Sequence, residues 1–276
     1  MVFEQMISLF GPGFVGGRFA ELYPTFTHVQ QRDERCPKNK NVLYFISTTN
    51  NYHVHDKITL DVDTNLRLLC ETLDYCRSED ITFNFVSSWF VYGQGGNVPA
   101  KEDDHCNPTG FYSITKYCAE NLIKSFAQTT GMKYRILRLC NVMGVGDTKA
   151  SRKKNAIQWM IGELKENRDV NIYDNGSHQR DVMHVDDVCR AIHLAITHGE
   201  FNEIYNIGSG KPTAVSELID NAVKYTKTTG KVHNIEPPVF HKNVQTKNFW
   251  LDTTKIQDLG FRQAVSNESI VYELCL

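Results

Sequence analysis

Tyr112 and Lys116 stand four positions apart in the segment YSITK, and both side chains can take part in proton transfer. This spacing places a phenol and an ammonium group on one face of a helix. A phenol, with a pKa of about 10, is a poor acid–base catalyst at neutral pH, but a neighbouring positive charge stabilises its phenolate form. The pair predicts a site that removes a proton from a substrate hydroxyl, although the same spacing also occurs on ordinary solvated helix faces.

Ser88 adds a hydroxyl group at the end of the apolar run 81–88, which predicts a buried strand. From the carboxyl end of a strand, this hydroxyl can hydrogen-bond to the same substrate oxygen that Tyr112 would deprotonate. Trp89 and Phe90 follow directly. Their rings are expected either to line the ligand pocket or to pack beneath it.

A glycine-rich loop, Gly11-Pro-Gly13-Phe14-Val15-Gly16, lies between a predicted strand at 6–10 and a predicted helix at 14–23. Such a turn brings backbone amides against a pyrophosphate, and the helix N-terminus adds a partial positive charge. The loop predicts dinucleotide binding, with a ligand-free glycine turn as the alternative. Asp33 would bond a free ribose 2′-hydroxyl and favours NAD, whereas Arg32 could meet a 2′-phosphate, which leaves NADP open.

Short apolar runs alternate with longer amphipathic stretches, which is typical of an α/β fold with a parallel sheet. The expected strands are residues 6–10, 26–31, 42–47, 81–88 and 133–139, and the expected helices are 14–23, 57–76 and 111–130. This order predicts a doubly wound sheet of Rossmann type. Residues 34–41 are too few for the usual helix and third strand, so the second strand is expected at the edge of a shortened sheet.

The pattern becomes less regular after residue 142. We expect helices at 155–167, 185–197, 215–226 and 252–261 and a short strand at 204–207. The predicted domains are residues 1–142, which bind the dinucleotide, and residues 143–276, a smaller region that mainly binds substrate. The boundary is soft, because segments of such regions often return to the core.

Composition narrows the class of protein. The chain has 276 residues, 41% of them apolar, and 30 basic against 32 acidic residues, so we expect a large core and no nucleic-acid partner. No apolar run could cross a membrane, and the N-terminus is typical of a first strand rather than a signal peptide. The eight scattered cysteines indicate thiols in a reducing cytoplasm, without disulfides or a metal site.

The sequence as a whole resembles the extended short-chain dehydrogenase/reductase family, the NAD-dependent epimerases and dehydratases of nucleotide sugars. The resemblance covers nearly the whole chain and rests on the segments GPGFVGG (11–17), SSWFVYG (87–93), YSITK (112–116), RLCNVMG (138–144), NGSHQRDVMHVDDV (175–188), YNIGSGKPTAVSELI (205–219) and LDTTKIQDLGF (251–261). It implies a nucleotide-diphosphate sugar as the substrate. It also implies that Ser88 polarises the substrate oxygen, Tyr112 acts as base or acid, and Lys116 holds the nicotinamide ribose and tunes Tyr112.

The resemblance further implies the binding residues. The cofactor is expected against Gly11, Gly13, Phe14, Val15, Gly16, Arg32, Asp33, Phe45, Ile46, Ser47, Tyr112, Lys116 and Cys140. The substrate is expected against Ser88, Trp89, Asn141 and Arg180. The Arg180 guanidinium suits a diphosphate, with an ion pair to Asp186 or Asp187 as the alternative. Asp61 stands where the family often has asparagine.

Three functions follow. Trp89 and Phe90 replace the Asp-Glu pair of the family's sugar 4,6-dehydratases, so dehydration is not expected. The favoured function is an NAD-dependent nucleotide-sugar epimerase acting at C4 through a transient keto sugar. The alternatives are an NADPH-dependent keto-sugar reductase of deoxy-sugar and glycan synthesis and a dinucleotide-binding protein without turnover.

Two expectations concern assembly and charge. Helices 57–76 and 111–130 commonly pair across a two-fold axis in this family, which predicts a homodimer. Their apolar faces could equally be ordinary core; they consist of Leu66, Leu69, Leu73, Leu122, Ile123 and Phe126. The basic run 149–154 is expected either to help hold a diphosphate or to form a solvated loop.

Overall fold

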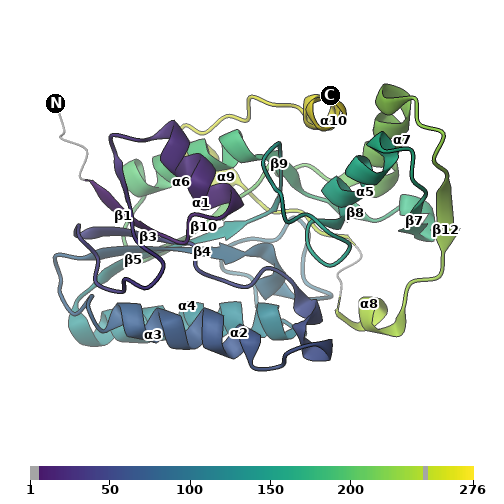
Figure 1. Cartoon of the computed structure of the whole chain (residues 1–276). Helices are drawn as coiled ribbons and strands as arrows, with labels where there is room; N and C mark the ends of the chain where they lie inside the picture. Colours follow the sequence, from purple (N-terminus) through teal and green to yellow (C-terminus); the bar gives the residue numbers. More distant parts are fainter. Residues whose placement is uncertain (1–5, 245–247) are drawn as a thin grey trace.

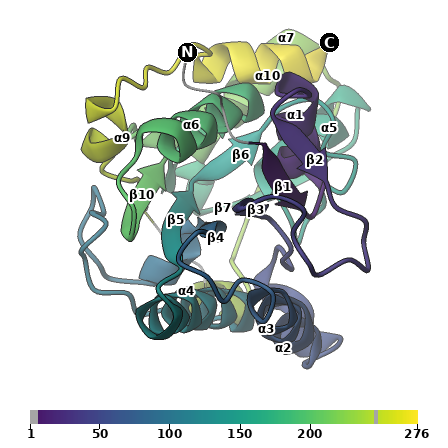
Figure 2. The same ribbon diagram turned by 90° about the vertical axis from the view of Figure 1, so that its left-hand side faces the viewer.

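The computed structural model describes residues 6–244 and 248–276 and shows a central parallel sheet between two helical layers (Figures 1 and 2). The strand order is β10-β5-β4-β3-β1-β2. The strands are β1 (Ile7–Phe10), β2 (Thr27–Val29), β3 (Asn41–Tyr44), β4 (Thr82–Ser88), β5 (Lys133–Leu139) and β10 (Glu203–Ile207). This is the predicted Rossmann-type fold.

Helices cover both faces of the sheet, as Figure 2 shows. One face carries α1 (Phe14–Leu22) and α6 (Val185–His198), and the other carries α2 (Leu60–Val62), α3 (Leu68–Leu73) and α4 (Phe111–Thr130). Strand side chains alternate between the two layers, so Leu9 packs in the cluster that includes α1 and α6 whereas Phe10 packs against α3 and α4. Burial on both faces explains why these strands read as continuous apolar runs.

The second strand lies at the edge of the sheet, as predicted. Among the described residues, β2 pairs with β1 and with no other strand. Residues 30–40 connect β2 to β3 through turns and contain no helix. The spacing in the sequence therefore identified the shortened side of the sheet correctly.

The helix expected at 57–76 differs from the prediction. The helical stretch begins at Leu60, contains a π-helical segment at Asp63–Arg67 and ends at Leu73, and a separate 3-10 turn covers Asn51–His55. The predicted apolar face is wrong at its start, because Ile58 and Val62 are 55% and 46% exposed. Asp61 and Asn65 are buried there instead and make polar contacts.

A smaller lobe lies beyond the carboxyl ends of the strands, on the right of Figure 1. It has its own apolar core and contains α5 (Ala156–Lys165), β7 (Val170–Tyr173), β8 (Gln179–Arg180), β11 (Thr213–Ala214), α7 (Val215–Thr226), β12 (Val232–Ile235), α8 (Val239–Val244) and α10 (Asn267–Cys275). A parallel pair of strands, β6 (Asn141–Met143) and β9 (Val182–His184), links this lobe to the sheet. Helix α9 (Thr254–Asp258) packs against β10. Within the described ranges, no helix is long and apolar enough to span a membrane.

Candidate active site

Ser88 and Tyr112 meet at the carboxyl edge of the sheet. Ser88 ends β4 and Tyr112 lies in the first turn of α4, so the Ser88 hydroxyl and the Tyr112 phenol lie at the same edge of the sheet. Burial raises the pKa of Tyr112 to about 12, while the nearby Ser88 side chain lowers that pKa and the charge of Asp61 raises it. The structure thus brings together two of the three side chains predicted for proton transfer.

Lys116 lies one helical turn beyond Tyr112 and is almost fully buried. Its Nζ donates to the carbonyl oxygen of Val86 and lies 4.0 Å from the centroid of the Phe85 ring. Burial lowers the pKa of Lys116 to about 7, and the nearby Glu120 carboxylate opposes that decrease. An ammonium with this pKa can lose or hold its proton near neutral pH, which suits a group that tunes a phenol.

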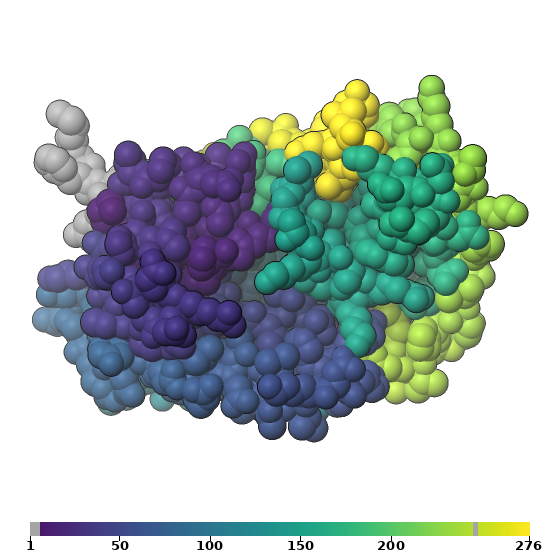
Figure 3. Space-filling view, viewed as in Figure 1, coloured from purple at the N-terminus to yellow at the C-terminus, as the bar shows by residue number. Residues whose placement is uncertain are grey.

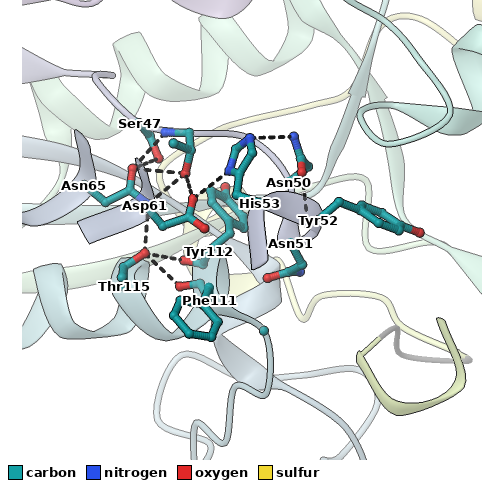
Figure 4. Close-up of polar contacts among 12 residues, drawn as sticks. Ser47, Asn50, Asn51, Tyr52, His53, Asp61, Asn65, Phe111, Tyr112 and Thr115 are labelled. Carbon is teal, nitrogen blue, oxygen red and sulfur yellow. Dashed lines mark hydrogen bonds and ion pairs between the residues drawn. The ribbon is translucent and has the colours of Figure 1, made fainter. Parts of the chain in front are cut away.

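The first turn of α4 is attached to the loop after β3 (Figure 4). Gly110 is the N-cap and has no side chain to offer, so the Asn51 side-chain oxygen accepts from the Ser113 backbone N–H at 3.2 Å. A Cβ on Gly110 would lie 2.1 Å from that oxygen, which is why glycine is needed there. Asn65 Nδ2 donates to Thr115 Oγ1 at 2.8 Å. These bonds hold the helix that carries Tyr112.

A buried acid–imidazole pair lies beside this turn. Asp61 is fully buried, and its Oδ1 accepts from the Thr48 hydroxyl and lies 3.0 Å from His53 Nδ1 (Figure 4). Its Oδ2 is buried without a hydrogen-bond partner among the described residues. No sequence motif marks His53, because its contact with Asp61 depends on the 3-10 turn at Asn51–His55.

The glycine loop makes a tight turn between β1 and α1. Gly11 has φ +82°, and a Cβ there would lie 2.8 Å from the Ile46 backbone nitrogen. A Cβ on Gly16 would lie 2.6 Å from the Gly11 carbonyl oxygen, whereas one on Gly13 would meet open space. The α1 N-terminus, which begins at Phe14 and Val15, has no side-chain cap and leaves its N–H groups available to an anion.

The other predicted cofactor residues lie after the carboxyl ends of neighbouring strands, where open α/β sheets bind ligands. Arg32 and Asp33 are both exposed in the turn after β2. Phe45, Ile46 and Ser47 follow β3, and the Ser47 hydroxyl donates to Asn65 Oδ1 at 3.0 Å. Cys140 follows β5 and is buried, with a pKa well above that of an ordinary thiol because of that burial.

A cavity of about 440 Å³ opens between the sheet and the smaller lobe. Three of the four predicted substrate residues, Trp89, Asn141 and Arg180, line it, whereas Ser88 is not among its lining residues. Residues that the sequence did not single out as ligands also line it, among them Asn50, Tyr52, Trp159, Tyr173, His178 and His241. In Figure 3 the teal residues of the lobe lie directly against the dark-blue residues of the sheet half.

The aromatic pair after Ser88 both lines the cavity and packs. The Trp89 and Phe90 rings stack at 4.0 Å, and Trp89 also stacks on Phe249 at 4.8 Å. Phe90 meets the Tyr112 ring edge-on at 6.1 Å, so an apolar wall adjoins the predicted base.

Arg180 is one of the basic side chains that line the cavity. Arg180 is buried near the Trp89 ring, and burial lowers its pKa to about 10. The alternative for Arg180 was an ion pair with Asp186 or Asp187. In the structure, Asp186 pairs with Arg18 and Asp187 pairs with Arg190.

The basic run 149–154 divides between the cavity and the surface. Arg152 and Lys153 line the cavity, and Lys153 also pairs with Asp56 at 2.7 Å. Lys154 pairs with Asp147 at 2.7 Å. Within the described part of the chain, no group of His, Cys, Asp and Glu side chains is arranged to hold a metal ion.

Comparison with known proteins identifies the class. The model of the NAD dependent epimerase/dehydratase family matches residues 29–208, and the chain belongs to this family. It is 30% identical over 207 residues to a putative UDP-glucose 4-epimerase of Methanocaldococcus jannaschii, a match that covers 74% of this chain and 66% of that protein. The chain thus spans about two thirds of the length of that curated relative.

Solved structures of similar fold extend the comparison. A UDP-glucose 4-epimerase of Thermotoga maritima with UDP-glucose has a TM-score of 0.86 at 23% identity, covering 98% of this chain and 97% of that one. RMD of Pseudomonas aeruginosa, complexed with NADPH, has a TM-score of 0.83 at 19% identity with the same coverages. At these identities, the likeness establishes the fold.

Proposed function

We propose that this protein is an NAD-dependent nucleotide-sugar epimerase that acts at C4. The observation that carries the proposal is the placement of Ser88 and Tyr112 at one edge of the sheet beside buried Lys116, next to a cavity that Arg180 lines. A phenol, a hydroxyl and an ammonium in this arrangement suit reversible proton transfer at a sugar hydroxyl. The relatives named above support the nucleotide-sugar class.

The cofactor would rest on the glycine loop, with its pyrophosphate at the α1 N-terminus and its nicotinamide end towards Tyr112 and Lys116. When bound, NAD would accept a hydride from the sugar carbon and return it to the opposite face. Tyr112 takes the hydroxyl proton as hydride leaves and gives it back on return. Ser88 holds the reacting oxygen, and the Lys116 ammonium favours the phenolate.

The cavity walls suit a sugar that must present both faces to Tyr112. Trp89 and Phe90 contribute flat apolar surfaces, which offer few directional hydrogen bonds to a turning keto sugar. Arg180 would anchor the diphosphate during that movement, because its guanidinium fork matches phosphate oxygens. Neither ring can transfer protons, so this wall also argues against dehydration.

An NADPH-dependent keto-sugar reductase is the second candidate. It is favoured by Arg32, which is exposed beside Asp33 at the sheet edge and could reach a 2′-phosphate. A neighbour of the same fold, RMD, is complexed with NADPH. The two candidates differ in net redox change, because an epimerase regenerates its cofactor and a reductase oxidises NADPH stoichiometrically.

The test is incubation with UDP-glucose and UDP-galactose, followed by proton NMR of the sugar and by absorbance of reduced nicotinamide. We expect inversion at C4 without accumulation of reduced cofactor, and no inversion by Tyr112→Phe. Stoichiometric oxidation of NADPH with a UDP- or GDP-keto-sugar would replace the epimerase with the reductase. The same result for wild type and Tyr112→Phe would refute the catalytic role of Tyr112.

We also propose that the protein forms a homodimer through α4 and the helices beside it. Leu69, Leu73 and Ile123, which were expected on the dimer face, are buried in the core of the chain itself. The exposed apolar side chains of α4 are Ile114 and Leu122, each about 40% exposed. A sedimentation mass near that of one 31.6 kDa chain would exclude the dimer.

A further inference from the structure

Two histidines flank Arg180 at the wall of the cavity. His178 lies just before β8, and His241 is carried by α8 from the other side; both line the cavity together with Arg180. Helix α8 rests on the loop after β3 through Phe240, whose ring is 4.9 Å from Tyr52 and 4.8 Å from His55. Figure 1 shows α8 beneath β7 and β12, apart from the helices of the sheet.

The His241 imidazole is held in place but incompletely bonded. Its ring lies 4.6 Å from the Tyr173 ring, and its Nδ1 is buried without a hydrogen-bond partner among the described residues. A buried polar atom without a partner costs free energy that a ligand can recover. The unpartnered nitrogen therefore indicates that a bound group completes this wall.

The charges around His241 are mainly positive. Burial is the main cause that lowers the pKa of His241 to about 4, and the charges of Arg180 and His178 lower it further. Asp174 opposes them, but its carboxylate is 2.8 Å from His178 Nε2. At neutral pH the ligand-free imidazole is therefore uncharged.

Other charged side chains also line the cavity. Arg152 and Lys153 add positive charge to the lining. Two carboxylates also line the cavity, but each has its own base: Glu163 pairs with Arg168 at 2.8 Å, and Asp169 pairs with His233 at 2.9 Å. An anion with several oxygens could accept hydrogen bonds from the Arg180 guanidinium and from the imidazole together.

We propose that His241 binds the diphosphate of the nucleotide sugar and takes up a proton from solvent when that diphosphate binds. The inference rests on the proposed function for its ligand class. The dianion would lie against Arg180 and His241, and its negative charge would offset the burial and the repulsion that together keep the imidazole neutral. One N–H bond forms on the imidazole and one bond to hydrogen breaks in the buffer acid that gives up the proton, and no bond of the nucleotide sugar changes.

Proton uptake makes binding depend on pH. Because the complex holds more protons than the separate partners, affinity must fall as pH rises above the free pKa of about 4, until the pKa of the complex is passed. With one proton taken up, the dissociation constant rises roughly tenfold per pH unit in that window. A neutral imidazole that merely donates a hydrogen bond would give no such slope.

Calorimetry with UDP-glucose tests the proposal, because the diphosphate of this probe keeps the same charge through the range used. Titrations at mildly acidic pH in two buffers of different ionisation enthalpy give the number of protons exchanged. We expect wild type to take up about half a proton to one proton per UDP-glucose, and His241→Gln to take up none, with a flat pH dependence. His105→Gln, at an exposed histidine, should behave as wild type.

The outcomes separate the two proposals. UDP-glucose binding without proton uptake overturns the role of His241 and leaves the epimerase in place. Uptake that persists in His241→Gln but disappears in His178→Gln would show that His178, not His241, takes up the proton, and this result also overturns the inference. If UDP-glucose, dTDP-glucose and GDP-mannose all fail to bind the wild-type chain, the proposed function fails as well. Imidazole carbon NMR of wild type with and without UDP-glucose gives the same answer without any variant.

Discussion

Glu120 and Arg138 form a buried ion pair that ties α4, the helix that carries Tyr112, to the sheet. Their side chains are 0% and 2% exposed, and Arg138 donates to both carboxylate oxygens, at 3.1 and 2.7 Å. Ser87, the neighbour of Ser88, donates to the same carboxylate, and Glu120 lies one turn beyond Lys116. The pair therefore fixes the relative position of β4, β5 and α4.

Glu120→Gln should be strongly destabilising. The amide keeps one acceptor oxygen but leaves the Arg138 guanidinium uncompensated in the core, and breaking a buried pair on one side costs about 3–5 kcal/mol. Because the amide oxygen retains one bond, we expect the lower end, about 3 kcal/mol, which is a factor of roughly 100 in the unfolding equilibrium. Urea denaturation followed by circular dichroism measures the loss.

The matched control is Glu163→Gln. Glu163 also accepts two bonds from one arginine, Arg168, both at 2.8 Å, but that arginine is 56% exposed. An exposed pair contributes less than about 1 kcal/mol, so this variant should unfold at nearly the wild-type urea concentration. Equal losses for Glu120→Gln and Glu163→Gln, or a loss below about 1 kcal/mol for the buried variant, would refute the reasoning.

Three further predictions concern the site. Tyr112→Phe should retain dinucleotide binding but lose at least about a hundredfold in turnover, because the proton acceptor is gone; unchanged turnover would contradict its role. Gly11→Ala should weaken dinucleotide binding at least about tenfold by fluorescence titration, since φ is +82° and the added Cβ would lie 2.8 Å from the Ile46 nitrogen. Gly13→Ala is the control for folding: a Cβ there meets open space, so this variant should unfold at the wild-type urea concentration. Asp61→Asn removes a negative charge that raises the pKa of Tyr112, so the rising limb of the pH–rate profile should move to lower pH, and a profile that does not move would refute the coupling.

Much of the fold was predictable because its signals are local. The glycine loop is bounded by β1 and α1, and α4 covers the predicted residues 111–130. The edge position of β2 followed from the shortness of residues 34–41, since a helix and strand need more chain. The start of the helix at 57–76 was wrong because two apolar residues, Ile58 and Val62, face solvent there.

The position of site residues was predictable where they share a helix or end a neighbouring strand of the sheet. Tyr112 and Lys116 share a helix, and Ser88 ends the adjacent strand, so their meeting follows from topology. The contact of His53 with Asp61 and the placement of His241 beside Arg180 depend on how distant segments pack. No spacing in the sequence encodes those contacts, and the α8 segment carries no periodic pattern long enough to indicate its position.

The central claim is that this chain uses a bound dinucleotide without consuming it. The most direct measurement is to denature freshly purified protein and identify the released dinucleotide by mass spectrometry. We predict NAD or NADH in a substantial fraction of chains, because an epimerase keeps its cofactor through the cycle. A protein that is empty and binds neither NAD nor NADPH when they are added would contradict the account.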